Sequence, residues 1–220
     1  MNKLLKIDIV SDVSCPWCII GYQSLAGALD RLEPKIFAHI TWKPFELNPN
    51  MTVAGQHLGE HLHEKYGSTA ADIEQTRNMI AARGAAVGFQ FNFKDNGRIY
   101  NTFNAHRLLY WARTFDKQTE LELALFKLYF SDGGNPGNPE ELIKAVEKIG
   151  LPKDDARKIL ESDQFVTEVR EEEAKYQAMG VTSVPTFIIN DKYMITGGQP
   201  VEVFVDTLNK IAAEDAQLNK

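Results

Sequence analysis

The chain has 220 residues, of which 44% are hydrophobic and 25% are charged, and its formal net charge is −6. A chain of this length buries roughly 70% of the surface that its unfolded form exposes, so its core needs neither a disulfide nor a metal. The acidic balance and the scattered Lys and Arg residues argue against a nucleic-acid-binding protein, and no apolar run approaches the roughly 20 residues of a membrane-spanning helix.

The N-terminal residues predict a β-α-β unit. Residues 4–11 are rich in β-branched side chains and indicate a strand, which Lys6 and Asp8 make too polar for a secretory signal. Residues 17–32 have helical periodicity. A second strand is predicted at 36–46, with a break or a sheet edge near its end. Without a signal pattern, we expect a cytoplasmic protein.

The middle of the chain predicts helices almost throughout. Gly- and Pro-rich turns separate the helical patterns, and Phe89 to Phe93 reads as a short extended link. The predicted helices are 57–66, 69–86, 101–114, 117–131, 139–149, 153–160 and 162–179.

The C-terminal residues return to strands. Residues 186–189 and 193–196 flank Asn-Asp-Lys and predict a hairpin, followed by a helix at 200–213 and a frayed tail from Ala213. The element order predicts an α/β, thioredoxin-like fold with a large all-helical insertion. Its domains would be a discontinuous thioredoxin-like domain, 1–56 and 180–220, and an inserted helical domain, 57–179.

The two cysteines of the chain, Cys15 and Cys18, lie where the first strand gives way to the first helix. Two cysteines placed at random would show this spacing roughly once in a hundred cases. A thiolate at position 15 would be stabilised by the unpaired N–H groups and the dipole of the helix, which lower a cysteine pKa. Pro16 suits the first helical position, and Cys18 lies one turn on, within reach of the Cys15 sulfur.

This arrangement predicts disulfide exchange. A substrate thiolate attacks Cys15 of the oxidised pair and forms a mixed disulfide, which a second thiol or Cys18 resolves. Trp17, between the cysteines, is predicted either to dock substrate or to pack against the insert. The redox-active disulfide would then be the only cofactor, and the partners would be protein or small-molecule thiols and disulfides.

Several motifs together resemble the DsbA-like family of the thioredoxin superfamily, and within it the cytoplasmic FrnE-like branch. The resemblance implies a thioredoxin fold with a helical domain, a dithiol/disulfide centre at Cys15 and Cys18, and a cis proline at Pro185 that helps to hold extended substrate. Pro16, Trp17 and Val184 are the expected substrate contacts. The matching motifs are residues 11–18, 101–108, 180–187 and 197–200.

The same architecture also resembles 2-hydroxychromene-2-carboxylate isomerases and kappa-class glutathione transferases. Those proteins typically carry serine at the position of Cys15, so the cysteine pair favours redox chemistry. A glutathione-dependent isomerase or transferase is the alternative function, and glutathione is an alternative co-substrate. A thiol-regulated or metal-bridged binding protein is the non-enzymatic hypothesis.

Four other polar residues are weighed as site candidates. His57 and His61 match a short zinc-enzyme pattern and would share a helix face, but a solvated helix is the preferred interpretation. No second Cys-x-x-Cys pair completes a zinc site, so we expect no metal. Asp12 is predicted to cap a turn, with a proton relay to Cys18 as the alternative. His106 is predicted to pack or cap, with a position facing the cysteines as the alternative.

Overall fold

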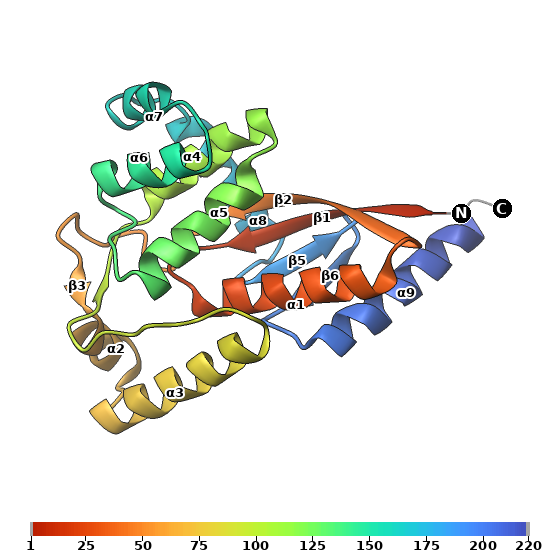
Figure 1. Cartoon of the computed structure of the whole chain (residues 1–220), viewed down its shortest axis with the longest axis horizontal. Coiled ribbons are helices and arrows are strands. Elements are labelled where there is room, and N and C mark those ends of the chain that lie inside the picture. The colour runs from red at the N-terminus through yellow and green to blue at the C-terminus, as the bar shows by residue number, and fades with distance from the viewer. Residues whose placement is uncertain (1, 219–220) are drawn as a thin grey trace.

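The computed structural model describes residues 2–218 and builds a four-stranded mixed sheet. Its strands are β1 (Lys3–Ser11), β2 (Ile36–Pro44), β5 (Thr186–Ile189) and β6 (Tyr193–Thr196), in the order β2-β1-β5-β6 (Figure 1). β2 runs parallel to β1, whereas β5 runs antiparallel to β1 and forms the predicted hairpin with β6. The thioredoxin-like fold predicted from the element order is confirmed.

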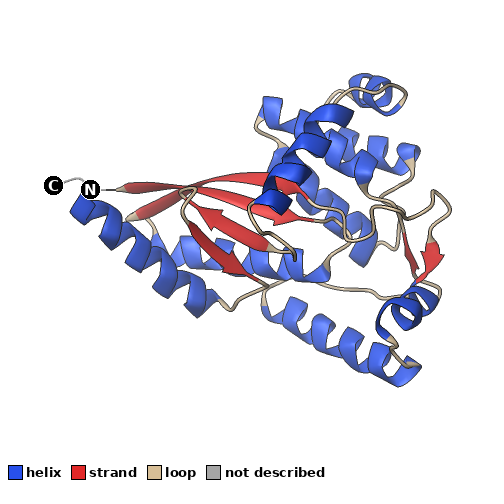
Figure 2. Cartoon of the chain, turned by 180° about the vertical axis from the view of Figure 1, so that it is seen from behind, coloured by secondary structure: helices blue, strands red, loops and turns tan. Residues whose placement is uncertain are grey.

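Helices cover both faces of the sheet. α1 (Pro16–Leu32) and α9 (Val201–Leu218) lie side by side on the face seen in Figure 1, where β1 buries alternate side chains such as Ile7. The opposite face buries Val10 and is covered by α8 (Val166–Ala178), as the view from behind shows (Figure 2). The alternation along β1 therefore supplies two separate apolar surfaces from one strand.

The residues between β2 and β5 are mainly helical, and all strands of the four-stranded sheet lie outside 57–179. The helices α5 (Gln118–Phe126) and α8 nevertheless contact β2, so this segment packs on the sheet rather than standing apart from it. The division into two domains stays a prediction. The remaining elements are β3 (Gln56–His57), α2 (Leu58–Tyr66), α3 (Ala70–Ala86), β4 (Arg98–Ile99), α4 (Phe103–Ala112), η1 (Arg113–Phe115), α5 (Gln118–Phe126), η2 (Lys127–Ser131), α6 (Pro139–Lys148) and α7 (Lys153–Leu160).

The predicted helix 162–179 begins later, at Val166. The cause is Arg107, whose buried guanidinium donates hydrogen bonds to backbone carbonyls of the preceding loop, among them those of Ser162 and, at 2.9 Å, Gln164. A buried arginine needs acceptors for its fixed set of donors. The loop supplies them only by staying non-helical.

Several other boundaries differ from the prediction. The strand 36–46 ends at Pro44, which lies on an edge strand as expected. The helix 101–114 begins at Phe103, because the Asn101 side chain accepts a hydrogen bond from its N–H at 3.0 Å. The helix 117–131 continues beyond α5 as the π-helical turn η2. The helix predicted at 200–213 continues as α9 to Leu218, so the tail predicted to fray from Ala213 is helical up to that residue, and its last two positions lie outside the described residues.

Two glycines of α1 give a matched test of how closely this helix packs. A Cβ on Gly21 would lie 3.0 Å from the Phe187 ring and 3.2 Å from Pro185 Cγ, whereas one on Gly27 would meet only Val201 at 3.7 Å. We expect Gly21→Ala to lower the free energy of unfolding by about 1–3 kcal/mol through overpacking. Gly27→Ala should raise it by about 0.5–1 kcal/mol, because alanine restricts the unfolded chain. Denaturant unfolding of both variants checks the pair, and a stabilised Gly21→Ala would contradict the close packing.

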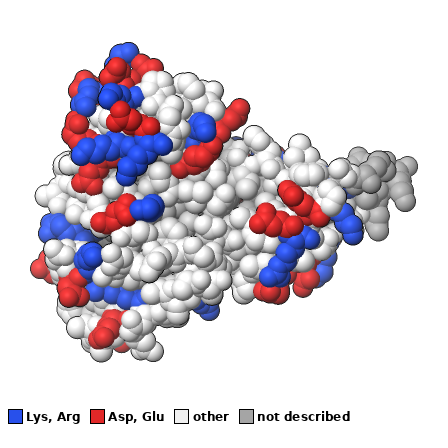
Figure 3. All heavy atoms as spheres, in the orientation of Figure 1, with Lys and Arg blue, Asp and Glu red and all other residues white. Residues whose placement is uncertain are grey.

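Charge is intermixed on the molecular surface. On the face shown in Figure 3, Lys and Arg lie among Asp and Glu, and a broad central area carries neither sign. That face has no continuous basic stripe of the kind that binds a nucleic-acid backbone. Within residues 2–218, no helix is both long enough and apolar enough to cross a lipid bilayer.

Candidate active site

Cys15 is the N-cap residue of α1, and Pro16 occupies the first helical turn. The turn before it is held by Asp12, whose carbonyl accepts from the Cys15 N–H at 2.9 Å and whose carboxylate accepts from the Ser14 N–H at 3.0 Å. The Cys18 N–H donates to the Cys15 carbonyl at 3.1 Å. The sequence therefore folds the two cysteines into one tight turn at the start of the helix, as their spacing predicts.

The hairpin segment reaches Cys15 from the other end of the chain. The Val184–Pro185 peptide bond is cis, as predicted. Cys15 Sγ lies 3.6 Å from the Val184 carbonyl oxygen, and a Cβ on Gly198 would lie 3.1 Å from the Trp17 carbonyl. The structure thus brings together the cysteine turn, the cis proline and the Gly197–Gly198 turn, three of the motifs on which the family resemblance depends.

The two thiols differ in their surroundings. Both are free, and both belong to the buried core, but Cys15 is 3% exposed and lines a pocket, whereas Cys18 is completely buried. Burial raises the pKa of the Cys18 thiol, and the hydrogen bond with Cys15 raises it further. Cys15 is consequently the thiol that a molecule in the pocket can contact, and Cys18 stays protonated near neutral pH.

The pocket beside Cys15 has a volume of about 590 Å³. α2, α3, β4 and η2 enclose it opposite the cysteine turn, and Pro16, Trp17 and Val184 line it together with Cys15. Trp17 is half-buried and also contacts the insert, because the Arg83 guanidinium lies 5.5 Å from its ring centroid. Trp17 therefore packs against the insert, and its role in docking substrate stays a prediction. The aromatic lining residues are Trp17, Tyr66, Phe93, Tyr100, Tyr129 and Phe130.

The charged side chains that line the pocket are mainly cationic, in contrast to the net charge of the chain. Lys65, Arg77, Lys94 and Arg98 line it, whereas Asp72 is its only lining carboxylate among the described residues. Sequence analysis did not single out these residues, because they are spread over α2, α3, β4 and the segment before β4. An apolar pocket with a cationic rim favours a ligand that combines an apolar body with negative charge.

Asp12 and His106, which were weighed as relay or site residues, lie close to each other. The Asp12 carboxylate also accepts from the Leu47 N–H at 2.7 Å, so it caps the turn as predicted. His106 Nε2 lies 4.0 Å from the Asp12 carboxylate and 3.1 Å from the Phe45 carbonyl oxygen. Burial lowers the pKa of His106, although Asp12 opposes this shift, and the imidazole is therefore neutral at pH 7. It packs behind the cysteine turn rather than lining the pocket.

Sequence analysis missed a buried carboxyl group behind Cys18. Glu122 of α5 is 1% exposed, and its Oε1 accepts a hydrogen bond of 2.9 Å from the Ser11 hydroxyl. Burial raises the pKa of Glu122 to about 8. Helical periodicity could have indicated its burial, because Glu122 lies on the same buried stripe of the helix as Gln118, Leu121 and Leu125.

The predicted helix face shared by His57 and His61 does not exist, because His57 belongs to the short strand β3 and α2 begins after it. The ring of His57 contacts the Asp95 carbonyl oxygen at 3.1 Å, and that of His61 contacts the Gln56 side-chain oxygen at 2.9 Å. Across residues 2–218, no three His, Cys, Asp or Glu side chains are grouped as metal ligands would be.

Comparisons with known proteins match most of the chain. The model of the DSBA-like thioredoxin domain family matches residues 6–209. The uncharacterized protein YwbO of Bacillus subtilis is 25% identical over 91% of this chain and 94% of its own. The probable DsbA oxidoreductase SCO1869 of Streptomyces coelicolor superposes with a TM-score of 0.86, at 26% identity over 94% of this chain and 89% of its own.

A more distant structure shares the fold. The cytosolic disulfide reductase DsbM of Pseudomonas aeruginosa, solved with GSH, has a TM-score of 0.61 and 13% identity, and the match covers 98% of this chain and 100% of that one. These similarities are consistent with the FrnE-like branch named from the motifs.

Proposed function

Because the chain belongs to the DsbA-like thioredoxin family, we propose that it is a thiol–disulfide oxidoreductase that acts through its Cys15-Pro16-Trp17-Cys18 centre. One observation carries the proposal. Cys15 lies at a helix N-terminus on the wall of a pocket, beside the Val184 carbonyl, while Cys18 is buried behind it in the same turn.

The exchange proceeds in two steps. A substrate thiolate attacks Cys15 Sγ of the oxidised centre, the Cys15–Cys18 bond breaks, and Cys18 leaves as a thiolate that takes up a proton. A second substrate thiolate then attacks the sulfur of the bound substrate, which leaves with it as a disulfide, and Cys15 is released as a thiolate. Two thiols are oxidised and one protein disulfide is reduced. In the opposite direction, Cys18 resolves the mixed disulfide.

The residues around Cys15 are proposed to orient the substrate. Pro16, Trp17 and Val184 line the pocket around Cys15, and Pro185 follows Val184, whose carbonyl oxygen contacts Cys15. An extended thiol compound could bind along that segment by backbone hydrogen bonds. We place this activity in the cytoplasm, where a single cysteine pair is expected to form a transient rather than a structural disulfide.

The proposal is tested by titrating the purified protein with mixtures of reduced and oxidised glutathione. We expect a reversible Cys15–Cys18 disulfide, seen by mass spectrometry as the loss of the two thiol hydrogens. Its midpoint gives the direction of the reaction, because a potential near about −120 mV belongs to an oxidant and one near about −270 mV to a reductant. If the two sulfurs never form a bond across the titration, the proposal is wrong.

Glutathione as co-substrate is the second candidate, and the cationic pocket favours it. Its free carboxylates and small size suit an enclosed pocket of about 590 Å³ with four cationic side chains. We therefore expect kcat/KM for glutathione disulfide to fall with added salt more steeply than kcat/KM for the uncharged hydroxyethyl disulfide, since salt screens the exposed rim. Equal salt dependence for the two disulfides would contradict this.

A matched pair of lysine variants tests whether the preference for glutathione disulfide comes from the pocket beside Cys15. Lys94 lines the pocket and is exposed, whereas Lys158 of α7 is exposed outside that pocket. Lys94→Gln should reduce kcat/KM for glutathione disulfide up to about fivefold at low salt, as expected for an exposed charge pair, and Lys158→Gln should not.

The Cys18→Ser variant distinguishes disulfide exchange from the alternative function, a glutathione-dependent isomerase or transferase. An isomerase or transferase binds glutathione without an intramolecular disulfide, so its turnover would survive Cys18→Ser. Redox exchange that regenerates a Cys15–Cys18 bond would not.

A further inference from the structure

The face of α3 that lines the pocket beside Cys15 carries a positive charge in the middle of an apolar stripe. Ile73, Arg77 and Ile80 all line this pocket, and their helical spacing places them on one face of α3. Ile80 is buried, and the Arg77 side chain is only 20% exposed. A largely buried charge between two isoleucines needs a partner, because burying an unpaired charge is costly.

The described residues supply Arg77 with few acceptors. Its Nη2 donates to the Lys94 carbonyl oxygen at 3.3 Å, and its Nη1 lies 3.9 Å from the carboxylate of Asp95, a fully exposed side chain. Its Nε is buried without a hydrogen-bond partner among the described residues. A guanidinium has five N–H donors in a fixed plane, which matches the two oxygens of a carboxylate. Most of these donors are therefore left for a ligand in the pocket.

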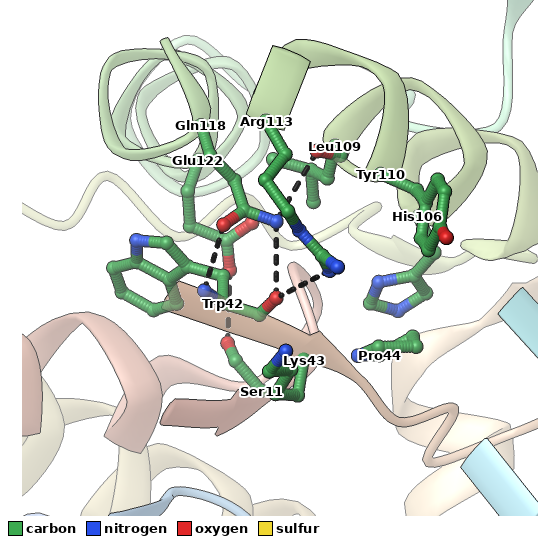
Figure 4. Close-up of a pocket in the computed structure, with 10 residues that line it drawn as sticks. All are labelled: Ser11, Trp42, Lys43, Pro44, His106, Leu109, Tyr110, Arg113, Gln118 and Glu122. Carbon is green, nitrogen blue, oxygen red and sulfur yellow. Dashed lines mark hydrogen bonds between the residues drawn. The ribbon is translucent and has the colours of Figure 1, made fainter. Parts of the chain in front are cut away.

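Two other arginines with largely buried side chains are paired within the protein. Arg113 also has a buried Nε without a partner, but its terminal nitrogens donate to the Glu172 carboxylate at 3.0 and 2.9 Å. It donates in addition to the Trp42 carbonyl oxygen, as the dashed line in Figure 4 shows. Arg107 donates to three backbone carbonyl oxygens. Arg77 differs from both, and it is the one of the three that lines the pocket beside Cys15.

Other charged side chains of the pocket are already engaged. Arg98 and Lys65 each donate at least two hydrogen bonds to the loop between β2 and β3. The carboxylate of Asp72 accepts from the N–H and the hydroxyl of Thr69, at 2.9 and 2.7 Å, in the N-terminal cap of α3. Among the described residues, no carboxylate that lines the pocket pairs with Arg77.

Aromatic rings lie beside Arg77. The guanidinium carbon of Arg77 lies 6.0 Å from the centroid of the Phe93 ring, and Phe93 meets the Phe130 ring edge-on at 6.5 Å. Phe130 belongs to the π-helical turn η2, a type of turn that is frequent at functional sites. Both rings line the pocket, together with Cys15. A ligand that fills the pocket therefore contacts a thiol, two aromatic rings and a guanidinium.

Resting on the proposed disulfide exchange, we propose that Arg77 binds the carboxylate of a small disulfide with an apolar body, and so selects this class of substrate for Cys15. The guanidinium donates two parallel hydrogen bonds to the carboxylate, while Phe93 and Phe130 pack on the apolar body. In the reduced protein, the Cys15 thiolate attacks the nearer sulfur, the substrate disulfide breaks, and one half leaves as a thiolate. Cys18 then loses its proton, forms the bond to Cys15 and displaces the other half as a thiolate. One substrate disulfide is thus reduced to two thiols, and the protein dithiol is oxidised.

Binding in the absence of redox chemistry tests the carboxylate contact. Isothermal titration calorimetry of the reduced protein with phenylbutyrate and with phenylbutyramide compares one apolar body with and without a negative charge. We expect the carboxylate to bind at least about tenfold more tightly, the order expected for hydrogen bonds between charged groups. In Arg77→Gln this preference should disappear. Arg77→Lys should restore only part of it, because an ammonium cannot form the planar pair.

Two aromatic disulfides test selection by Cys15. Ellman's reagent carries a carboxylate on each ring, whereas dithiodipyridine is aromatic and uncharged. We expect Arg77→Gln to lower the second-order rate constant for Ellman's reagent at least about tenfold more than that for dithiodipyridine, measured by stopped flow. Glutathione disulfide, whose carboxylates lie on a peptide, should lose less than Ellman's reagent.

The matched control is Arg31→Gln, which removes the same charge from the chain. Arg31 pairs with Glu202 on the surface and does not line the pocket, so both rate constants should stay at their wild-type values. Equal slowing of the two aromatic disulfides in Arg77→Gln would indicate structural damage and overturn the proposal. Equal binding of phenylbutyrate and phenylbutyramide by the wild-type protein would overturn it too.

The remaining outcomes separate this proposal from its premise. If Arg77→Gln slows glutathione disulfide as much as Ellman's reagent, Arg77 recognises a carboxylate without an apolar body, and the assigned substrate class is wrong. If phenylbutyrate binds through Arg77 but Cys15 and Cys18 never form a bond, the carboxylate contact is supported and the proposed function is contradicted.

Discussion

Cys15→Ser is expected to abolish disulfide exchange, reducing turnover by at least about a thousandfold, the order of loss seen when a catalytic nucleophile is removed. The reason is geometric. Cys15 Sγ lines the pocket and contacts the Val184 carbonyl, and the completely buried Cys18 cannot replace it. Turnover of glutathione disulfide under saturating reductant measures the loss.

Cys18→Ser should behave differently. Cys15 still attacks a disulfide, but the mixed disulfide has no internal thiol to resolve it, so in the absence of added thiol we expect a stable covalent adduct on Cys15 that mass spectrometry detects. Gly27→Ala, on the same helix and away from the pocket, is the control that should retain turnover. If Cys15→Ser retained turnover while Cys18→Ser lost it, the assigned order of the two thiols would be reversed.

The second large effect concerns stability and pH. The pKa of Glu122 is raised from 4.5 to about 8 in the folded protein, so the folded state binds a proton that the unfolded state has lost between these values. Its stabilising effect is complete below pH 4.5 and disappears as pH rises to about 8. The slope is about 1.4 kcal/mol per pH unit, and the total is on the order of 5 kcal/mol for this fully buried group.

Glu122→Gln removes this titration. The difference in free energy of unfolding between Glu122→Gln and the wild type should therefore move in favour of the variant by several kcal/mol from pH 5 to pH 8. Denaturant unfolding at these pH values measures it. The difference for Glu120→Gln should stay flat, because Lys117 lowers the pKa of Glu120 and keeps it ionised throughout. A flat difference for Glu122→Gln would mean that its carboxyl group is not perturbed.

Much of the fold could be predicted because its signals are local. The spacing of Cys15 and Cys18, the periodicity of α1 and the turn residues between β5 and β6 each depend on neighbours in sequence. The pairing of β3 with β4 could not be predicted, since strands of two residues carry no periodicity. The start of α8 depends on Arg107, which lies far from it along the chain.

The candidate site was predictable only in part, because some of its residues are brought together by contacts between distant parts of the chain. Its chemical centre is one short motif, whereas the cationic rim gathers Lys65, Arg77, Lys94 and Arg98 from separate elements. Glu122 is the clearest example of a residue whose position could not be predicted from the sequence. Helical periodicity places it on the inner stripe of α5, but only the packing of α5 against β2 places it beside Ser11.

The contact between Cys15 and Val184 joins residues 169 positions apart. During synthesis, both cysteines therefore emerge from the ribosome long before the segment around Val184, which contacts Cys15 in the folded protein, has been made. Throughout that interval the nascent chain carries an unprotected dithiol, open to cross-linking by any oxidant or neighbouring thiol. Completion of the hairpin near the end of synthesis is thus the moment at which these sulfurs become a selective site.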